Sequence, residues 1–219
     1  MNYPHIIVDN FFTYPDKIRE FGLAQSFYTD PEGRWPGVRT DYLHETNPEF
    51  CHKLLNKVFS LTQNIHKEPP EYLCSLHFQK VDASYKGGWV HTDGVDTIAA
   101  FIIYLSPDAD VNEGTSLYQV KDPITHIDSF HLDKKAETFT NSDLIDSHEK
   151  FRIEANAQYK ETIFVGNSYN RLFMFDGSTY HGAKDFVSPT NDPRLTLIGF
   201  INTLNARHLP KRRSDLISL

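Results

Sequence analysis

The apolar residues of this chain follow two different periods, one before and one after about residue 70. In the first part they recur at the three- and four-residue spacing of amphipathic helices. One helix is predicted to open at Thr13-Tyr-Pro15-Asp16, where Thr13 is placed to cap it and Pro15 lies in its first turn. A second is predicted to open at Asn47-Pro48. Its broad apolar stripe consists of Phe50, Leu54, Leu55, Val58, Phe59 and Leu61.

Beyond that point the apolar residues form short runs rich in β-branched and aromatic side chains, with turn residues between most of them. Such runs predict strands. The candidates are Tyr72–Val81, Trp89–His91, Thr97–Leu105, Thr115–Val120, Thr162–Val165, Arg171–Asp176 and Arg194–Leu204. A series of short strands after two helices predicts an antiparallel sandwich or barrel that closes over helices.

Residues 121–160 show neither pattern. The stretch is polar, and its charged residues include Lys134-Lys135, Asp143, Asp146, Glu149 and Lys150. The part over Thr125–Thr140 is typical of a solvated loop. Loops of such length inside a compact domain are usually functional lids or disordered. We therefore expect one domain over residues 1–219 with a long insertion or lid at 121–160.

Composition narrows the class of protein. The 219 residues, 39% hydrophobic and 13% aromatic, suffice for one domain with a real core. No apolar run reaches the length of a membrane span, and the first residues do not resemble a signal peptide, so we expect a cytoplasmic protein. Cys51 and Cys74 are expected to be buried free thiols. The net charge of −7 argues against a nucleic-acid partner.

The tripeptide pattern His-x-Asp occurs three times, at His91-x-Asp93, His126-x-Asp128 and His131-x-Asp133. Random placement would give about one copy in such a chain, so context must choose between them. The first copy follows the turn signal Lys86-Gly87-Gly88 and precedes a continuous apolar run. The other two lie in the polar stretch. We therefore select His91 and Asp93 as the candidate ligand pair.

A second imidazole and an arginine complete the candidate chemistry. His181 follows an aromatic strand, and Arg194 opens the last predicted strand. Two imidazoles and one carboxylate on one face of an octahedral iron leave other positions open, which suits non-haem Fe(II) oxygenases. Alternation places Arg194, Thr196 and Ile198 on one strand face, where the arginine and the Thr196 hydroxyl could hold the far carboxylate of a diacid cosubstrate.

Several segments, in this order, resemble the prolyl-4-hydroxylase-like 2-oxoglutarate/Fe(II) oxygenases. They are Gly88-Trp-Val-His91-Thr-Asp93, Ile103-Tyr104-Leu105-Ser106, Glu113-Gly114-Thr115, Asn170-Arg-Leu-Phe-Met-Phe175, Tyr180-His181-Gly182 and Arg194-Leu-Thr. The chain looks most like the compact set common in bacteriophage and bacterial genomes. The resemblance implies a double-stranded β-helix, a cupin-like jelly-roll barrel whose mouth holds the metal.

The resemblance also implies a role for each candidate residue. His91, Asp93 and His181 would bind Fe(II) as the catalytic centre, and 2-oxoglutarate and dioxygen would take the open positions. Arg194, with Thr196, would hold the far carboxylate of 2-oxoglutarate. The reaction would hydroxylate a C–H bond and release succinate and carbon dioxide. Halogenating relatives replace the acid with a small residue, so Asp93 favours hydroxylation.

Several points stay open at this stage. Many relatives add a tyrosine to the cosubstrate contact, and Tyr85, Tyr104 and Tyr118 are all candidates. Arg39 is either a ligand for a substrate anion or an ordinary exposed turn arginine. Phe200 stands where nucleic-acid demethylases of the superfamily carry a second arginine. The substrate is a prolyl or amino-acid-like group or a small metabolite, and the oligomeric state is open. The alternatives to an oxygenase are a zinc-type hydrolase or isomerase and a non-catalytic metal-binding jelly roll.

Overall fold

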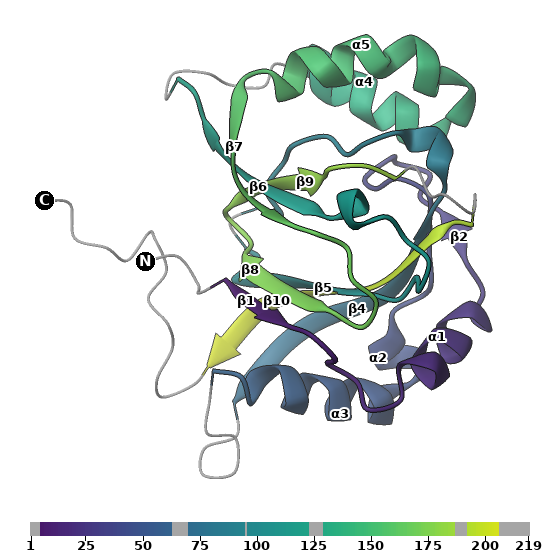
Figure 1. Cartoon of the computed structure of the whole chain (residues 1–219), viewed down its shortest axis with the longest axis vertical. Coiled ribbons are helices and arrows are strands. Elements are labelled where there is room, and N and C mark those ends of the chain that lie inside the picture. The colour runs from purple at the N-terminus through teal and green to yellow at the C-terminus, as the bar shows by residue number, and fades with distance from the viewer. Residues whose placement is uncertain (1–4, 63–69, 95, 123–128, 187–191, 206–219) are drawn as a thin grey trace, which may run out of the picture.

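The computed structural model describes residues 5–62, 70–94, 96–122, 129–186 and 192–205. Within them, the strands form two antiparallel sheets (Figure 1). The larger has the order β1-β8-β5-β10-β4-β3-β2 and the smaller β7-β6-β9. The strands are β1 Ile6–Val8, β2 Tyr28–Thr29, β3 Val38–Arg39, β4 Glu71–Val81, β5 Ala99–Tyr104, β6 Thr115–Val120, β7 Tyr159–Val165, β8 Leu172–Asp176, β9 Tyr180–Ala183 and β10 Arg194–Asn205.

Five α-helices flank these sheets in the described residues. They are α1 Pro15–Leu23, α2 Leu43–Thr46, α3 Pro48–Phe59, α4 Ser129–Thr140 and α5 Ile145–Asn156. Short 3-10 turns cover Ala83–Tyr85, Val111–Glu113 and Ser142–Leu144. The first three helices lie along the large sheet, whereas α4 and α5 lie beyond the small one (Figure 1). None of the described helices is both long enough and apolar enough to cross a membrane.

The apolar core has two main layers. Leu54, Val58 and Phe59 of α3 pack with Leu76 and Phe78 of β4 in the layer between the helices and the large sheet. A second cluster fills the space between the sheets. It consists of Ala100, Leu117, Val165, Phe173 and Phe175, with Ile102 and Phe200 packed against them. The expected layered β architecture is thus confirmed, and so are Cys51 and Cys74 as buried free thiols.

Strand β10 is central to the large sheet because it pairs with β4 on one side and β5 on the other. Thr196 lies opposite Gln79 of β4 and Tyr104 of β5, so these three side chains share one face. Leu195 and Leu197 belong to the helix-side core, which is the opposite face. The predicted alternation of Arg194 and Thr196 toward the interior is therefore correct.

Two local predictions were wrong. Thr13 does not cap α1: the residue at the cap position is Tyr14, and no side chain accepts a hydrogen bond there. Trp89–His91 is not a strand, since only His91 forms an isolated bridge. The backbone of this segment is bonded instead by the side chain of Asn156, which donates to Gly88 O at 2.9 Å and accepts from Val90 N at 2.8 Å.

The polar stretch also differs from a solvated loop. Residues 129–156 hold α4 and α5 with the 3-10 turn between them. Phe139 of α4 and Ile145 and Ala155 of α5 are buried against Tyr85 and Trp89 of the barrel. The loop interpretation was therefore wrong over residues 129–140, and its residues 125–128 lie outside the described residues. A role of 121–160 as a lid stays a prediction.

Candidate metal centre and cosubstrate cavity

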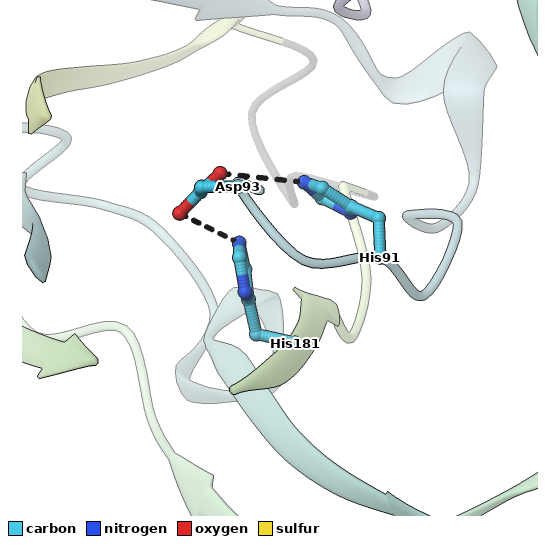
Figure 2. A group of neighbouring side chains, drawn as sticks. All are labelled: His91, Asp93 and His181. Carbon is cyan, nitrogen blue, oxygen red and sulfur yellow. Dashed lines mark ion pairs between the residues drawn. The ribbon is translucent and has the colours of Figure 1, made fainter. Parts of the chain in front are cut away.

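Three side chains from two separate segments meet at one point. His91 comes from the segment after Gly88, Asp93 follows two residues later, and His181 lies on β9. One ligand atom from each lies within 4.8 Å of the others. Nε2 of His91 lies 3.9 Å from one Asp93 oxygen, and Nε2 of His181 lies 3.6 Å from the other (Figure 2). The arrangement brings the three predicted ligands together.

The orientation of both imidazoles is set by their other ring nitrogen. Nδ1 of His91 donates to the carbonyl of Trp89 at 2.8 Å, and Nδ1 of His181 donates to the carbonyl of Thr179 at 2.9 Å. With the proton on Nδ1, each Nε2 presents its lone pair toward Asp93. Such outer hydrogen bonds fix the tautomer of histidines that bind metals.

The segment that carries His91 depends on a close backbone approach at Gly88. The amide of Gly88 donates to Ala183 O at 2.9 Å. A Cβ at position 88 would lie 2.6 Å from Ala183 N, which real Cβ atoms do not tolerate. Three residues on, the backbones of His91 and His181 exchange hydrogen bonds of 2.9 and 2.8 Å. A residue without a side chain at position 88 therefore lets the two histidine-bearing segments run side by side.

The electrostatics of the cluster favour metal binding. Burial lowers the pKa of His91 well below its ordinary value, and the nearby cation of Lys135 lowers it further. His91 is therefore neutral at physiological pH, which is the form that binds metals. Oδ2 of Asp93 is buried and has no hydrogen-bond partner among the described residues. A carboxylate whose two oxygens each face an imidazole nitrogen, one oxygen being buried without a hydrogen bond, fits a divalent cation that would supply the missing partner.

Arg194 lies deep in the same cavity and is only 6% exposed, which excludes an ordinary surface arginine. Its Nη1 donates to Glu113 O at 2.7 Å, and the guanidinium lies 5.5 Å from the ring of Tyr104 and 5.1 Å from that of Phe186. Burial lowers the pKa of Arg194, although arginine stays charged. Thr196 also lines the cavity. The two predicted cosubstrate residues are thus neighbours at one end of it.

Of the three candidate tyrosines, Tyr104 is the one beside Arg194. It is fully buried, and its hydroxyl donates to Thr115 Oγ1 at 2.8 Å. Tyr85 packs instead in the cluster under α4 and α5. Tyr118 lies opposite Tyr180 between β6 and β9. Tyr104 therefore supports the position of Arg194 and Thr115.

Arg39 is not an exposed turn residue. It lies on β3, half-buried, with its guanidinium 4.4 Å from the ring of Trp35 and 5.5 Å from that of Phe200, and it lines the cavity. Burial lowers its pKa to about 10, while the Asp93 carboxylate acts to raise it. The structure thus places Arg39 on the metal side of the cavity.

Lys135 of α4 is a cavity residue that the sequence did not reveal. Burial lowers its pKa to about 8, and the Asp93 carboxylate again acts in the opposite direction. Its helix reads as polar, so the only sequence signal is Phe139, four residues on and therefore on the same helix face. Phe139 is buried and lines the same cavity.

The other two His-x-Asp copies do not join the cluster as far as the structure describes them. His131 lies on α4, where its Nε2 is 3.9 Å from a carboxylate oxygen of Glu154. His91, Asp93 and His181 are the only group of three such ligands found in the described residues. His126 and Asp128 lie outside the described residues. The cavity that contains the cluster has about 810 Å³ of space, part of it open to solvent.

Solved structures with this fold come from several organisms. A prolyl hydroxylase from Trichoplax adhaerens, in complex with a hypoxia inducible factor oxygen degradation domain peptide fragment, is 11% identical with a TM-score of 0.55, covering 91% of this chain and 84% of that one. HygX from Streptomyces hygroscopicus, with nickel, 2-oxoglutarate and hygromycin B bound, is 14% identical with a TM-score of 0.54, covering 91% and 83%. A Pseudomonas putida prolyl-4-hydroxylase is 10% identical with a TM-score of 0.51, covering 91% and 92%.

These likenesses confirm the predicted fold, the double-stranded β-helix of prolyl-4-hydroxylase-like 2-oxoglutarate/Fe(II) oxygenases. At such low identities they show the fold alone. A search of curated protein sequences finds no match. One family model matches residues 1–201, and the chain therefore belongs to the family described as "Family of unknown function (DUF6445)".

Proposed function

We propose that this protein is an Fe(II)- and 2-oxoglutarate-dependent dioxygenase that hydroxylates a C–H bond. The observation that carries the proposal is the convergence of His91, Asp93 and His181 in a cavity that also holds the buried Arg194. Neither the three metal ligands nor the arginine alone would identify this activity. A facial His/Asp/His set suits several metals, and the buried arginine adds the preference for a diacid cosubstrate.

His91, Asp93 and His181 would hold the iron through the two Nε2 atoms and a carboxylate oxygen. Iron with 2-oxoglutarate and dioxygen supplies the oxidising chemistry, in which decarboxylation to succinate is coupled to hydroxylation. The protein's own part is orientation and exclusion of water. Arg194 offers donors to the far carboxylate of the cosubstrate, and Thr196 beside it offers a hydroxyl.

The identity of the third ligand supports hydroxylation in particular. In halogenating relatives a small residue replaces this acid so that a halide can bind the metal. Here Asp93 is present, and its two carboxylate oxygens lie 3.9 and 3.6 Å from Nε2 of His91 and of His181, which favours its role as the third ligand. Solved proteins of this fold include one crystallised with nickel and 2-oxoglutarate and one with a peptide, which supports either a small-molecule or a peptidyl substrate here.

The test needs no substrate. Under anaerobic conditions, Fe(II) and 2-oxoglutarate together should give the weak visible charge-transfer band of the chelate, and admission of air should release succinate slowly. Asp93→Ala should lose the band and the succinate release. His131→Ala serves as the control, because this histidine pairs with Glu154 outside the cluster. A protein that binds iron but gives neither band nor succinate would instead be a zinc-type hydrolase or isomerase, or a non-catalytic jelly roll.

A further inference from the structure

Two cations in the cavity, Arg39 and Lys135, form no ion pair with a carboxylate of the described residues, although the Asp93 carboxylate attracts both at longer range. No side-chain hydrogen bond joins either of them to another of the described residues, and Nε of Arg39 is buried without such a partner. Both residues line the cavity that contains Asp93. Burying unpaired charge costs free energy, so two such cations in one cavity call for an explanation.

Two neighbouring cations, Arg34 and Lys134, differ from Arg39 and Lys135 because each forms an ion pair within the protein. Arg34 also lines the cavity, but it forms a 2.9 Å ion pair with the buried Asp30. Lys134, adjacent to Lys135 on α4, pairs with Glu137 at 2.6 Å. Apart from Arg194, which the proposed function assigns to the cosubstrate, Arg39 and Lys135 are therefore the cations lining the cavity, among the described residues, that remain available to a bound anion.

The excess of positive charge in the cavity can be counted once iron and 2-oxoglutarate are bound, and this count rests on the proposed function. A divalent iron would balance Asp93 and the near carboxylate of 2-oxoglutarate. Arg194 would balance the far carboxylate. Arg34 is already balanced by Asp30. Two positive charges then remain in the loaded cavity, on Arg39 and Lys135, so electrostatic complementarity favours a substrate that brings negative charge.

The contacts of Arg39 suit that task. Its guanidinium lies against Trp35 and Phe200, 4.4 and 5.5 Å from the ring centroids. Contact with aromatic faces holds a guanidinium in place and leaves its N–H groups free to donate to a planar or tetrahedral oxyanion. Lys135 enters from α4, and its ammonium lies 5.8 Å from the ring centroid of Phe139. The two cations thus come from different elements and reach one cavity.

We propose that Arg39 and Lys135 form a subsite for an acidic group of the substrate, a carboxylate or a phosphate, next to the carbon that is oxidised. The aromatic rings beside the two cations, Trp35, Phe139 and Phe200, would contact the apolar part of the same substrate. The enzyme therefore acts on small acids or on acidic side chains or termini, rather than on neutral or cationic molecules.

The experiment uses the whole protein loaded with Mn(II) and saturating 2-oxoglutarate, with inorganic phosphate and phenylacetate as probes. Saturable paramagnetic broadening of the phosphorus or ring-proton signals measures affinity and shows that the probe lies near the metal. Arg39→Met and Lys135→Met should each lower the affinity for the probe by roughly 10-fold, because each removes one charge-assisted hydrogen bond. If only one probe is broadened, the acidic group that the subsite binds is a phosphate in the case of inorganic phosphate and a carboxylate in the case of phenylacetate.

Lys134→Met is the matched control and should leave probe affinity unchanged, because Lys134 pairs with Glu137. The affinity for 2-oxoglutarate is measured in every variant by the charge-transfer band with Fe(II). Loss of 2-oxoglutarate affinity in Arg39→Met or Lys135→Met would assign these cations to the cosubstrate and overturn the proposal. So would absence of probe binding, or equal binding in the double variant, in a protein that binds iron and 2-oxoglutarate. A wild-type protein that fails to bind iron and 2-oxoglutarate contradicts the proposed function itself.

Discussion

The backbones of His91 and His181 face each other across an antiparallel bridge, with N to O distances of 2.9 and 2.8 Å, and their rings lie 4.4 Å apart. Two ligands distant in sequence are thus held by main-chain bonds that do not depend on a metal. Because the flanking segments are buried, the cluster is largely formed before any ion arrives. A preformed site lowers the ordering cost of binding.

The first prediction concerns the ligands. His91→Ala and His181→Ala should each weaken Mn(II) binding by more than the roughly 10–100-fold that loss of an outer-shell partner costs. His131→Ala should bind Mn(II) like the wild type, because its ring pairs with Glu154. Electron paramagnetic resonance of free Mn(II) during a titration gives the affinities. If the His131 variant lost the metal and the His91 variant kept it, the wrong copy of the motif has been selected.

The second prediction concerns Asn156, whose side chain bonds both Gly88 O and Val90 N. Asn156→Ala leaves a buried amide of the His91 segment without a partner, which costs about 1–3 kcal/mol in the free energy of unfolding. Mn(II) affinity should fall as well, since the segment positions a ligand. Asn141→Ala is the control: it removes a side-chain cap at the turn between α4 and α5 and should lower stability without changing metal affinity. Equal metal affinity in the two variants would show that Asn156 has no positioning role.

The third prediction concerns Arg194. Loss of a charge-assisted hydrogen bond worth roughly 1.5–3 kcal/mol should weaken 2-oxoglutarate binding by on the order of 10- to 150-fold in Arg194→Ala. Iron should stay bound, and Arg194→Lys should lose less because it keeps the charge. Pyruvate lacks the far carboxylate, so its affinity should be the same for the wild type and for Arg194→Ala.

The control for Arg194 is Arg171→Ala, since that guanidinium pairs with Asp9 outside the cavity. Its affinity for 2-oxoglutarate, titrated by the charge-transfer band, should match the wild type. Unchanged 2-oxoglutarate affinity in Arg194→Ala would remove β10 as the cosubstrate strand.

The sequence was informative where strands are long. Arg194 and Thr196 begin a strand of twelve residues, so alternation alone assigned their face correctly. The barrel fold and the convergence of His181 with His91 were implied by the resemblance, because pairing between distant segments leaves no periodic pattern in the sequence. The order of the strands within each sheet was not predicted. Trp89–His91 reads as a strand, yet its Val90 amide donates to the side chain of Asn156 on α5, a long-range contact that no local pattern encodes.

The cavity residues Arg39 and Lys135 could not be predicted, because they lie on a very short strand and on a polar helix. Arg39 lies on a strand of two residues, too short to show alternation, so its burial could not be read from its neighbours. Helix α4 exposes Phe130 and Leu132 while it turns Lys135 and Phe139 toward the cavity. A helix that exposes apolar residues and turns a lysine inward reverses the usual amphipathic rule, so the stretch resembled a loop.

The fourth prediction follows from the pKa of Lys135, lowered by burial from 10.5 to about 8. At Lys135 the unfolded chain binds more protons than the folded one between these values, so the contribution of Lys135 to the free energy of unfolding should rise with pH across that window. Lys135→Met should be more stable than the wild type below pH 8, by a margin that shrinks toward pH 10.5. Urea unfolding of the metal-free proteins from pH 7 to 10.5 measures the margin, with Lys134→Met as control. A margin independent of pH would mean that Lys135 is not buried as a charge.

The fifth prediction concerns the thiols. Burial raises the pKa of Cys51 to about 11 and that of Cys74 to about 12, so neither forms much thiolate near neutral pH. Iodoacetamide at pH 8 should therefore modify both residues slowly in the native protein and rapidly in urea, as followed by mass spectrometry. Rapid native modification would mean that the core between α3 and β4 opens readily.

The segment that carries α4 and α5 connects the end of β6 to the start of β7, and these two strand ends are paired with each other. Val120 of β6 lies opposite Tyr159 of β7, and Lys121 N donates to Gln158 O at 3.0 Å just beyond them. With its base closed in this way, the segment can change length or sequence while the strands carrying His181 and Arg194 keep their register. Lys135, one of the two cations of the proposed substrate subsite, is thereby encoded in a stretch of the gene separate from that of the proposed metal ligands, whereas Arg39 lies on β3 outside it. Exchange of residues 129–156 between members of this family would be a route by which the proposed oxygenase acquires other substrates while its metal centre stays the same.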